Sequence, residues 1–438
     1  MNAKAPLYRN TRRKGWILSA IWLSSLTGLS SLCAQTQGKP SVEPSRCCIS
    51  ESHGYQNVKP EVACKRFDLY RELGVNMIRT EIGWREMEPS EEKWGGASRL
   101  AYIKLAQEKG FKLKMNVGTI SSPPAWFFAA HPDARIVSHY GDVSTNTISL
   151  WYPDLHQVVE RVTDQMFQYM AEAGLFKNLE FIDPDFGPAS EPLYPAAWTM
   201  GANYTKGEAF WCYDKNAQAD FLRKMKAKYT SIAVANAHWK SQFKTWDEVS
   251  IPQPGVRHGA FWEDVLTWYR DTKREFVLWQ IANYKAHLAK YNLKNVHLLL
   301  YVPGRHVTEQ EWHEAVTGGS GAKSVRIMCD SEFLLETAQK EQCWLQYTSS
   351  ASENEVAYLM SYMKQHGLRS IPMWGENAGD PVQAGNPGHL ADVIVNQGLY
   401  GLDYTHSYYV FDKDGLTPNA LFPKLKEAYS RIQHPSVP

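Results

Sequence analysis

The chain has 438 residues, of which 44% are hydrophobic and 21% are charged, and its formal net charge is +1. This composition excludes a disordered or fibrous chain and provides ample material for a globular core. Because 47 basic residues are balanced by 46 acidic ones without a basic stripe, a nucleic-acid partner is not expected.

The first 34 residues have the pattern of a secretory signal peptide. A basic segment precedes the apolar run 16–29, and small residues lead to Ala34. The apolar run is too short and too rich in serine for a membrane-spanning helix. We therefore predict export with cleavage near Ala34, a secreted or periplasmic location, and a flexible tail over residues 35–45. A lipid anchor at Cys33 is the less favoured alternative.

Apolar runs typical of strands alternate with amphipathic helical segments along the rest of the chain, which predicts an α/β fold. Helices are predicted over residues 62–73, 97–109, 155–174, 215–229, 263–291, 331–340, 354–366 and 423–432. Strands are predicted over residues 76–81, 111–117, 179–182, 296–302, 343–347, 370–374 and 398–404. About eight strand–helix units without an internal repeat indicate one (β/α)8 TIM barrel with long rim loops over residues 46–438. Residues 196–254 are predicted to form an insertion at the rim, which Asp214 and Asp220 hold together.

Two glutamates follow predicted strands. Glu191 comes shortly after the strand 179–182, and Glu376 comes directly after the strand 370–374. Because the C-terminal ends of all strands meet at one rim of a (β/α)8 barrel, these distant side chains are expected to share one site. Two opposed carboxyl groups are the usual equipment for hydrolysing a glycosidic bond. We therefore predict that Glu191 and Glu376 are the catalytic residues of a glycoside hydrolase with a carbohydrate substrate.

Six cysteines remain after the expected cleavage, and an even number in an exported protein favours disulfide bonds. They are Cys47, Cys48, Cys64, Cys212, Cys329 and Cys343. The candidate pairs are Cys329 with Cys343, and Cys64 with Cys47 or Cys48. No Cys-x-x-Cys motif or paired-histidine spacing accompanies them, so neither a metal site nor a cofactor is expected.

Several motifs resemble those of β-amylases, glycoside hydrolase family fourteen. Residues 187–195, Gly-Pro-Ala-Ser-Glu-Pro-Leu-Tyr-Pro, are similar to that family's general-acid loop, with Ser190 in place of a glycine. Residues 207–221, 266–269 and 375–378 are similar to further motifs of the family, in the same order. The resemblance implies that Glu191 is the general acid, that Glu376 is the base that activates water, and that hydrolysis inverts the anomeric configuration.

The same resemblance implies contacts with sugar at several positions. These are Glu81, His306, Thr348, Asn377 and Ala378, together with Tyr301 in place of a substrate-binding lysine and His406 in place of a sugar-binding arginine. For Glu81 the structural alternative is an ion pair with Arg79 or Arg85, and for His306 it is a hydrogen-bonded place in the core. Trp84 and Trp126 are candidate stacking platforms for sugar rings, with a place in the core as the alternative.

The β-amylase flap is missing from this chain. Residues 117–126, Val-Gly-Thr-Ile-Ser-Ser-Pro-Pro-Ala-Trp, instead resemble a turn of family forty-two β-galactosidases. That resemblance implies a retaining alternative with Glu376 as the nucleophile, although Ser190 stands where those enzymes have asparagine. A barrel that binds carbohydrate without catalysis is a further alternative. The missing flap and the replacements at Tyr301 and His406 predict that soluble starch is not the preferred substrate.

Overall fold

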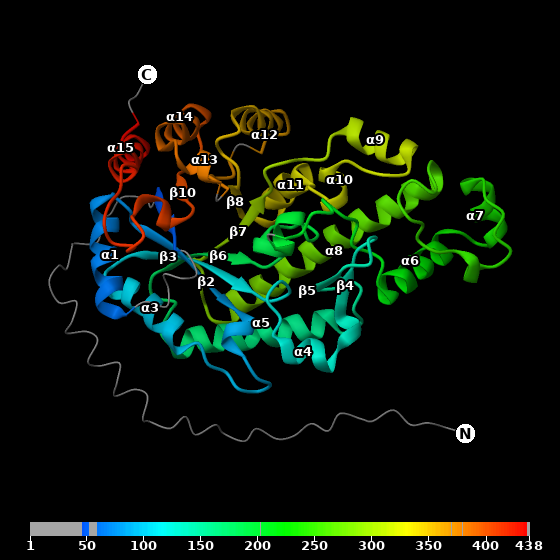
Figure 1. Cartoon of the computed structure of the whole chain (residues 1–438), viewed down its shortest axis with the longest axis horizontal. Coiled ribbons are helices and arrows are strands. Elements are labelled where there is room, and N and C mark those ends of the chain that lie inside the picture. Colours follow the sequence, from blue (N-terminus) through cyan, green and yellow to red (C-terminus); the bar gives the residue numbers. More distant parts are fainter. Residues whose placement is uncertain (1–45, 52–58, 202, 369, 379, 436–438) are drawn as a thin grey trace.

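The computed structural model describes residues 46–51, 59–201, 203–368, 370–378 and 380–435. Within these ranges, parallel strands close into an eight-stranded barrel in the order β1-β10-β9-β8-β7-β6-β3-β2 (Figure 1). The predicted (β/α)8 barrel is thereby confirmed. The predicted signal peptide and tail, residues 1–34 and 35–45, lie outside the described residues and stay predictions. No helix in the described ranges has the length and hydropathy needed to cross a membrane.

Seven of the eight barrel strands overlap strands predicted from the sequence. The barrel strands are β1 (Cys47–Ser50), β2 (Met77–Gly83), β3 (Lys112–Gly118), β6 (Leu179–Pro184), β7 (His297–Val302), β8 (Trp344–Tyr347), β9 (Met373–Glu376) and β10 (Leu402–Tyr404). The strand that the sequence did not predict, β1, has only four residues and no alternation of polar and apolar side chains. It closes the barrel, since Ile49 lies opposite Tyr404 of β10 and Ile78 of β2.

Helices follow the strands and cover the outside of the barrel (Figure 1). They are α1 (Pro60–Glu72), α3 (Ala97–Glu108), α5 (Leu155–Glu172), α8 (Ala260–Lys290), α11 (Ser331–Glu341), α12 (Glu353–Gln365), α14 (Pro387–Gln397) and α15 (Phe422–Gln433). In α5, the buried residues Leu155, Val159 and Val162 recur at steps of three or four and form the stripe that faces the core. Of these helices only α14 was not predicted.

Shorter elements lie in the connections. They are the hairpin β4 (Arg135–Val137) and β5 (Val143–Ile148), and the helices α2 (Trp84–Met87), α4 (Ala125–Ala130), α9 (Glu309–Gly318), α10 (Lys323–Ile327) and α13 (Pro381–Ala384).

An extension beside the barrel has a hydrophobic core of its own. It contains α6 (Lys215–Lys228), α7 (Ile232–Trp239) and the first half of α8, and projects to the right in Figure 1. Asp214 accepts hydrogen bonds from the first backbone N–H groups of α6, and Asp220 accepts one from the indole of Trp268, so both hold the insertion together as predicted.

The 31-residue helix α8 joins the two cores. At 1.5 Å per residue it is about 46 Å long. Its residues Phe261 and Trp268 belong to the core of the extension, whereas Phe276 and Ile281 belong to the core of the barrel. The extension is therefore packed onto the barrel through one continuous helix.

The cysteine pairs expected from the sequence are wrong. Among the described cysteines, Cys47, Cys48, Cys212, Cys329 and Cys343 are free thiols in buried positions. Neither Cys329 with Cys343 nor Cys64 with Cys47 or Cys48 is therefore a disulfide. Cys47 and Cys48 lie side by side in β1 and pack in the barrel as small apolar side chains.

The inside of the barrel changes from apolar to charged toward the active-site rim. Phe181, Leu299 and Trp374 belong to an apolar cluster in the interior. Close to this cluster, fully buried Lys114 forms an ion pair of 3.0 Å with fully buried Asp403 and lies 4.9 Å from the centre of the Trp374 ring. Burial alone would raise the pKa of Asp403, but Lys114 and Arg79 bring it below its usual range.

We expect Lys114→Met to lower the free energy of unfolding by about 3–5 kcal/mol at neutral pH, because the substitution leaves Asp403 buried without its main cation. In the wild type, the lowered pKa of Asp403 contributes stability that is present above its unfolded pKa of about 3.9 and is lost as the pH falls through the folded value. The deficit of the variant should therefore shrink toward acid pH, which denaturant unfolding at several pH values measures.

The exposed pair of Lys215 with Asp133 supplies the control, because the Lys215 side chain is 71% exposed. Lys215→Met should change stability by less than about 0.5 kcal/mol at every pH. A deficit for Lys114→Met that is equal at neutral and acid pH would contradict the role given to the buried ion pair.

Candidate active site

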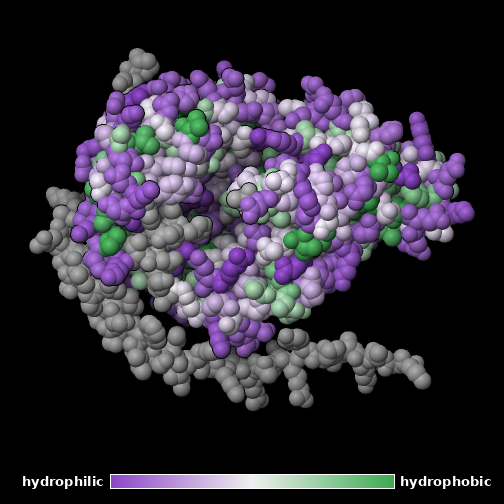
Figure 2. Space-filling view, viewed as in Figure 1, coloured by the Kyte–Doolittle hydropathy of each residue, from purple (hydrophilic) through white to green (hydrophobic). Residues whose placement is uncertain are grey.

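A cavity of about 630 Å³ opens at the C-terminal ends of the barrel strands. The face of the molecule in Figure 2 is hollowed near its centre, and the surface around the hollow is largely hydrophilic. Seven of the residues predicted from the sequence line the cavity: Glu81, Glu191, Tyr301, Thr348, Glu376, Ala378 and His406. The barrel therefore brings both predicted catalytic glutamates to one cavity.

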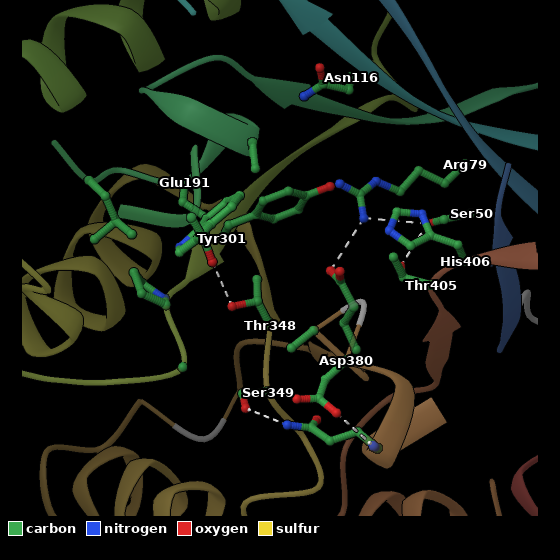
Figure 3. A pocket seen from close by; sticks show the side chains of 18 of the residues that line it. Ser50, Arg79, Asn116, Glu191, Tyr301, Thr348, Ser349, Asp380, Thr405 and His406 are labelled. Atoms are coloured by element: carbon green, nitrogen blue, oxygen red, sulfur yellow. Dashed lines mark hydrogen bonds and ion pairs between the residues drawn. The ribbon is translucent and has the colours of Figure 1, made fainter. Parts of the chain in front are cut away.

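Glu191 is buried and has a hydroxyl as its partner. Thr348 Oγ1 donates a hydrogen bond of 2.7 Å to Glu191 Oε1 (Figure 3). Among the described residues, Glu191 forms no ion pair. Burial, opposed by the bond from Thr348, raises the pKa of Glu191 to about 7, and the nearby charge of Glu376 acts in the same direction as burial. A large fraction of Glu191 is therefore protonated near neutral pH.

The turn that carries Glu191 has an unusual backbone. Ala189 and Ser190 have φ values of 55° and 64°, in the left-handed region that costs residues with a Cβ about 1–2 kcal/mol each. The Ser190 hydroxyl accepts a hydrogen bond from the Asn116 amide of β3. At Gly187 a Cβ atom would lie 2.4 Å from the carbonyl oxygen of Leu193, so only glycine fits there. At position 190 the β-amylase resemblance led us to expect glycine. Ser190 stands there instead and still adopts the left-handed backbone conformation that favours glycine.

Glu376 ends β9 and is held by cationic and amide groups. Arg79 Nη1 lies 3.3 Å from Glu376 Oε2, and the Gln346 side chain donates a hydrogen bond to the same oxygen. The backbone N–H of Glu376 donates to Ser350 Oγ at 2.9 Å. Burial raises the pKa of Glu376, while Arg79, Lys114 and Gln346 favour its ionised form. The two glutamates therefore have different surroundings in one cavity.

The sequence analysis did not predict that Arg79 contacts Glu376 in the barrel interior. Besides Glu376, it lies 3.8 Å from Asp183 and 3.7 Å from Asp403, and its guanidinium lies 4.9 Å from the centre of the Tyr301 ring. A usable signal was present, because Arg79 and Glu81 are two residues apart on one strand and hence share a face.

Tyr301 and the C-terminal ends of the strands shape the rest of the cavity. The Tyr301 hydroxyl donates to Asp183 Oδ2 at 2.5 Å, so its ring is held in place beneath the site. In Figure 3, Glu191 and Thr348 lie on one side of Tyr301, and Arg79 lies on the other. The two carboxyls predicted to be catalytic, Glu191 and Glu376, are thus supported by different partners around the cavity.

Glu81 and His406 line the cavity as predicted, but Glu81 does not have the partner considered from sequence. Glu81, whose side chain is 34% exposed, lies 3.9 Å from Arg99 rather than beside Arg79 or Arg85. The His406 ring stacks on Tyr408, with their centres 5.3 Å apart. Both side chains border space that a sugar can occupy.

Four residues predicted to bind substrate lie outside the cavity lining. Trp84 is fully buried and donates to Glu88 Oε2 at 2.6 Å, and Trp126 donates to the Glu88 carbonyl at 2.9 Å. Trp84 belongs to the core, and Trp126, which is partly buried, packs against that core and bonds its N–H to the same residue as Trp84. The prediction that Trp84 and Trp126 are stacking platforms for sugar rings is therefore wrong.

His306 and Asn377 also turn away from the cavity. His306 Nδ1 lies 2.9 Å from Glu355 Oε2, and its ring stacks on Tyr358 with centres 4.1 Å apart. Asn377 is fully buried and bonds both the carbonyl and the N–H of Thr405. Asn377 therefore fixes the backbone that follows β10 instead of contacting a sugar directly.

Several residues of the cavity rim were not predicted from the sequence. They include Trp198, Glu208, Arg305, Asp380 and Gln383. Trp198 is 60% exposed. In a cavity lined by polar groups, such a ring offers an apolar face to the C–H side of a sugar. Because loop positions lack periodicity, only the folded chain reveals these residues.

No cluster of three or more histidine, cysteine or acidic side chains within the described ranges has a geometry that could hold a metal ion.

Comparisons with known proteins place this geometry in a family. The family model described as β-galactosidase, glycoside hydrolase family 42, matches residues 54–317. A thermophilic β-amylase from Thermoanaerobacterium thermosulfurigenes is 26% identical over 226 residues, which cover 45% of this chain and 39% of that protein. The β-galactosidase BgaB from a Geobacillus species is 21% identical over 218 residues, which cover 48% of this chain and 30% of that protein. The matches thus span less than half of these relatives.

Solved structures share the fold. The catalytic domain of a β-amylase from Paenibacillus polymyxa superposes with a TM-score of 0.72 at 16% identity, covering 90% of this chain and 100% of that one. A cold-adapted β-galactosidase from Rahnella sp. R3 gives a TM-score of 0.60 at 13% identity, covering 90% of this chain and 57% of that one. The resemblances to β-amylases and β-galactosidases are therefore confirmed, and the chain is a glycoside hydrolase that belongs to the family 42 of β-galactosidases.

Proposed function

We propose that the protein hydrolyses O-glycosidic bonds of an oligo- or polysaccharide, with Glu191 as general acid and Glu376 as the second catalytic carboxylate. The observation that carries this proposal is the unequal surroundings of two buried carboxyls in one cavity. Glu191 has a hydroxyl partner and, among the described residues, no ion pair, whereas Glu376 contacts Arg79 and Gln346. Such differences assign opposite roles, because the acid must hold a proton and its partner must be ionised.

In the proposed reaction, Glu191 transfers its proton to the glycosidic oxygen while the bond from that oxygen to the anomeric carbon breaks. Glu376 takes a proton from a water molecule, whose oxygen forms the new bond on the opposite face of the sugar ring. The product has the inverted configuration. Glu191 is left ionised and Glu376 protonated, and proton exchange with solvent restores both.

The match to family 42 supports a second candidate mechanism. Here Glu376 attacks the anomeric carbon while Glu191 protonates the leaving group, and a glycosyl-enzyme forms. Water, activated by the now ionised Glu191, then releases the sugar with retained configuration. The ion pair with Arg79 suits this role as well, because Arg79 favours the ionised form of Glu376 against the effect of burial and fixes the direction of its carboxylate.

The names of the relatives set the order in which substrates should be screened. β-Galactosides and α-glucans come first, because the matched proteins are named β-galactosidase and β-amylase. Aryl glycosides of both sugar series, together with polysaccharides, make up a first screen.

We expect Glu191→Gln and Glu376→Gln each to lower kcat/KM by on the order of 10²–10⁴-fold on the substrate that the screen identifies, because each removes a proton-transfer group or nucleophile. Both substitutions preserve side-chain shape, so the far-ultraviolet circular dichroism should stay unchanged. Initial-rate kinetics measure the loss.

Glu355→Gln is the matched control, since Glu355 is a glutamate that pairs with His306 outside the cavity lining. It should retain activity close to the wild type. Wild-type turnover by either Glu191→Gln or Glu376→Gln would sink the proposed roles.

The raised pKa of Glu191 predicts the alkaline limit of activity. Because the acid works only when protonated, kcat/KM should fall as the pH rises through about 7. Thr348→Val removes a hydrogen bond that favours ionised Glu191, so the pKa of Glu191 should rise and the alkaline limb should move to higher pH. Rate profiles from pH 4 to about pH 9 test this. The control is Thr317→Val, on the exposed face of α9, which should leave the alkaline limb in place. An alkaline limb that stays or moves to lower pH in Thr348→Val would contradict the role of Glu191 as general acid.

The configuration of the first product separates the two mechanisms. Inversion is expected if Glu376 activates water, and retention if it forms a covalent intermediate. Proton NMR in the first minutes of the reaction, before the free sugar equilibrates, shows the anomer directly. A fluorinated glycoside that becomes attached to Glu376 would decide for the retaining mechanism.

A further inference from the structure

The turn that carries Glu191 is contacted from two sides, by Asn116 of the barrel strand β3 and by α8 outside the barrel. Its residues Ala189 and Ser190 adopt left-handed φ values, which only a surrounding structure can maintain in residues with a Cβ. Inside the turn, the backbone N–H of Leu193 donates to the Glu191 carbonyl at 2.7 Å. That short-range bond does not connect the turn to the rest of the fold.

Lys273 of α8 makes such a connection. Its ammonium group donates hydrogen bonds of 3.1 Å to the Phe186 carbonyl and 2.8 Å to the Leu193 carbonyl. These two carbonyls lie before and after the turn, so one side chain joins both of its ends. The ammonium also lies 4.6 Å from the centre of the Tyr194 ring.

A lysine at this place is not explained by packing alone. Lys273 is 4% exposed, and among the described residues it forms no ion pair. Burial lowers its pKa to about 7, against the nearby charge of Asp185. Because a buried amine is costly without compensating contacts, an apolar side chain would fill the space more favourably. Compared with an apolar side chain, Lys273 adds the two hydrogen bonds to the Phe186 and Leu193 carbonyls.

The place of Lys273 along α8 makes it a rigid anchor. It lies between Tyr269, which belongs to the core of the extension, and Phe276, which belongs to the core of the barrel. Two turns further on, Gln280 donates to the Asp185 carbonyl at 3.0 Å. The helix also packs against β6, the strand that leads into the turn (Figure 1). The segment that leads to Glu191 is therefore held from one helix at two points.

We propose that Lys273 is a positioning residue that ties both ends of the turn to α8 and so sets the direction and the burial of the Glu191 carboxyl. This inference rests on the proposed role of Glu191 as general acid. Its consequence is specific: loss of Lys273 impairs proton donation to the leaving group more than it impairs substrate binding or the action of Glu376.

The test compares leaving groups. A dinitrophenol departs without a proton, whereas a poor leaving group such as phenol needs the general acid. For aryl β-galactosides or maltosides, whichever series the enzyme accepts, Lys273→Met should lower kcat/KM by about 10–100-fold on the phenyl glycoside, below the full value of general-acid catalysis. The loss on the dinitrophenyl glycoside should stay under about threefold, because no proton is transferred there.

A pH profile provides a second readout that a purely structural defect would not move. Burial is the largest cause of the raised pKa of Glu191. A turn released from α8 admits water to that carboxyl, so the alkaline limb of kcat/KM should move to lower pH in Lys273→Met. This direction is opposite to that expected for Thr348→Val.

Lys285→Met is the matched control, because Lys285 lies on the same helix in an exposed ion pair with Glu341. It should leave both readouts unchanged. If Lys273→Met does not fold, Lys273→Gln takes its place, since a shorter neutral amide cannot join both carbonyls and should show the same pattern.

Glu191→Gln separates failure of the inference from failure of the proposed function. If Glu191→Gln loses activity mainly on the phenyl glycoside while the Lys273 variant loses equally on both glycosides, or on neither, the positioning role is overturned. If Glu191→Gln shows no dependence on the leaving group, the general-acid role fails, and the inference about Lys273 fails with it.

Discussion

Two cations in the barrel interior, partly buried Arg79 and fully buried Lys114, determine how the rim of the cavity is assembled. Arg79 lies within 4 Å of acidic groups from β6, β9 and β10, and Lys114 pairs with Asp403 of β10. A charge that is removed from water must find compensating charges nearby, so these strands can close only in a register that brings the carboxylates to the cations. The same contacts leave Glu376 oriented at the cavity wall. The contacts that favour closure of the barrel therefore also orient Glu376, the proposed second catalytic carboxylate.

Glu191 and Glu376, which we propose to be the catalytic glutamates, are supported in opposite ways. Glu376 is held from inside the barrel by a cation and an amide, which favour its ionised form. Glu191 is carried by a turn that α8 contacts from outside. Among the described residues its carboxyl has a hydroxyl partner and no ion pair, so burial raises its pKa with no cation in contact. The fold thereby gives the two carboxyls different hydrogen-bonding and charged partners although they share one cavity. The extension beside the barrel contributes to this difference, because it packs on the helix that carries Lys273.

The barrel is shared with relatives, and the rim above it is built from the connections between its elements. Structures of β-amylases and β-galactosidases superpose on the barrel at identities of 16% and below. At such identities the superposition shows a shared fold. The cavity rim is built from loop residues such as Trp198, Glu208 and Asp380. Substrate preference in this architecture is expected to depend on such loops, since they can vary without disturbing strand register.

The sequence by itself determined the strand–helix alternation, the closed barrel and the meeting of Glu191 with Glu376, because apolar runs are local signals and strand ends share one rim. Only the tertiary structure decided which side chains contact one another. Arg79 bonds a glutamate 297 positions away rather than its neighbour Glu81. Trp84 lies in the core and Trp126 packs against it, although their types suit a sugar site. The cysteine pairs and the contacts of Lys273 were hidden for the same physical reason: a side chain's partner across the barrel depends on register and helix packing, which no local pattern of residues records.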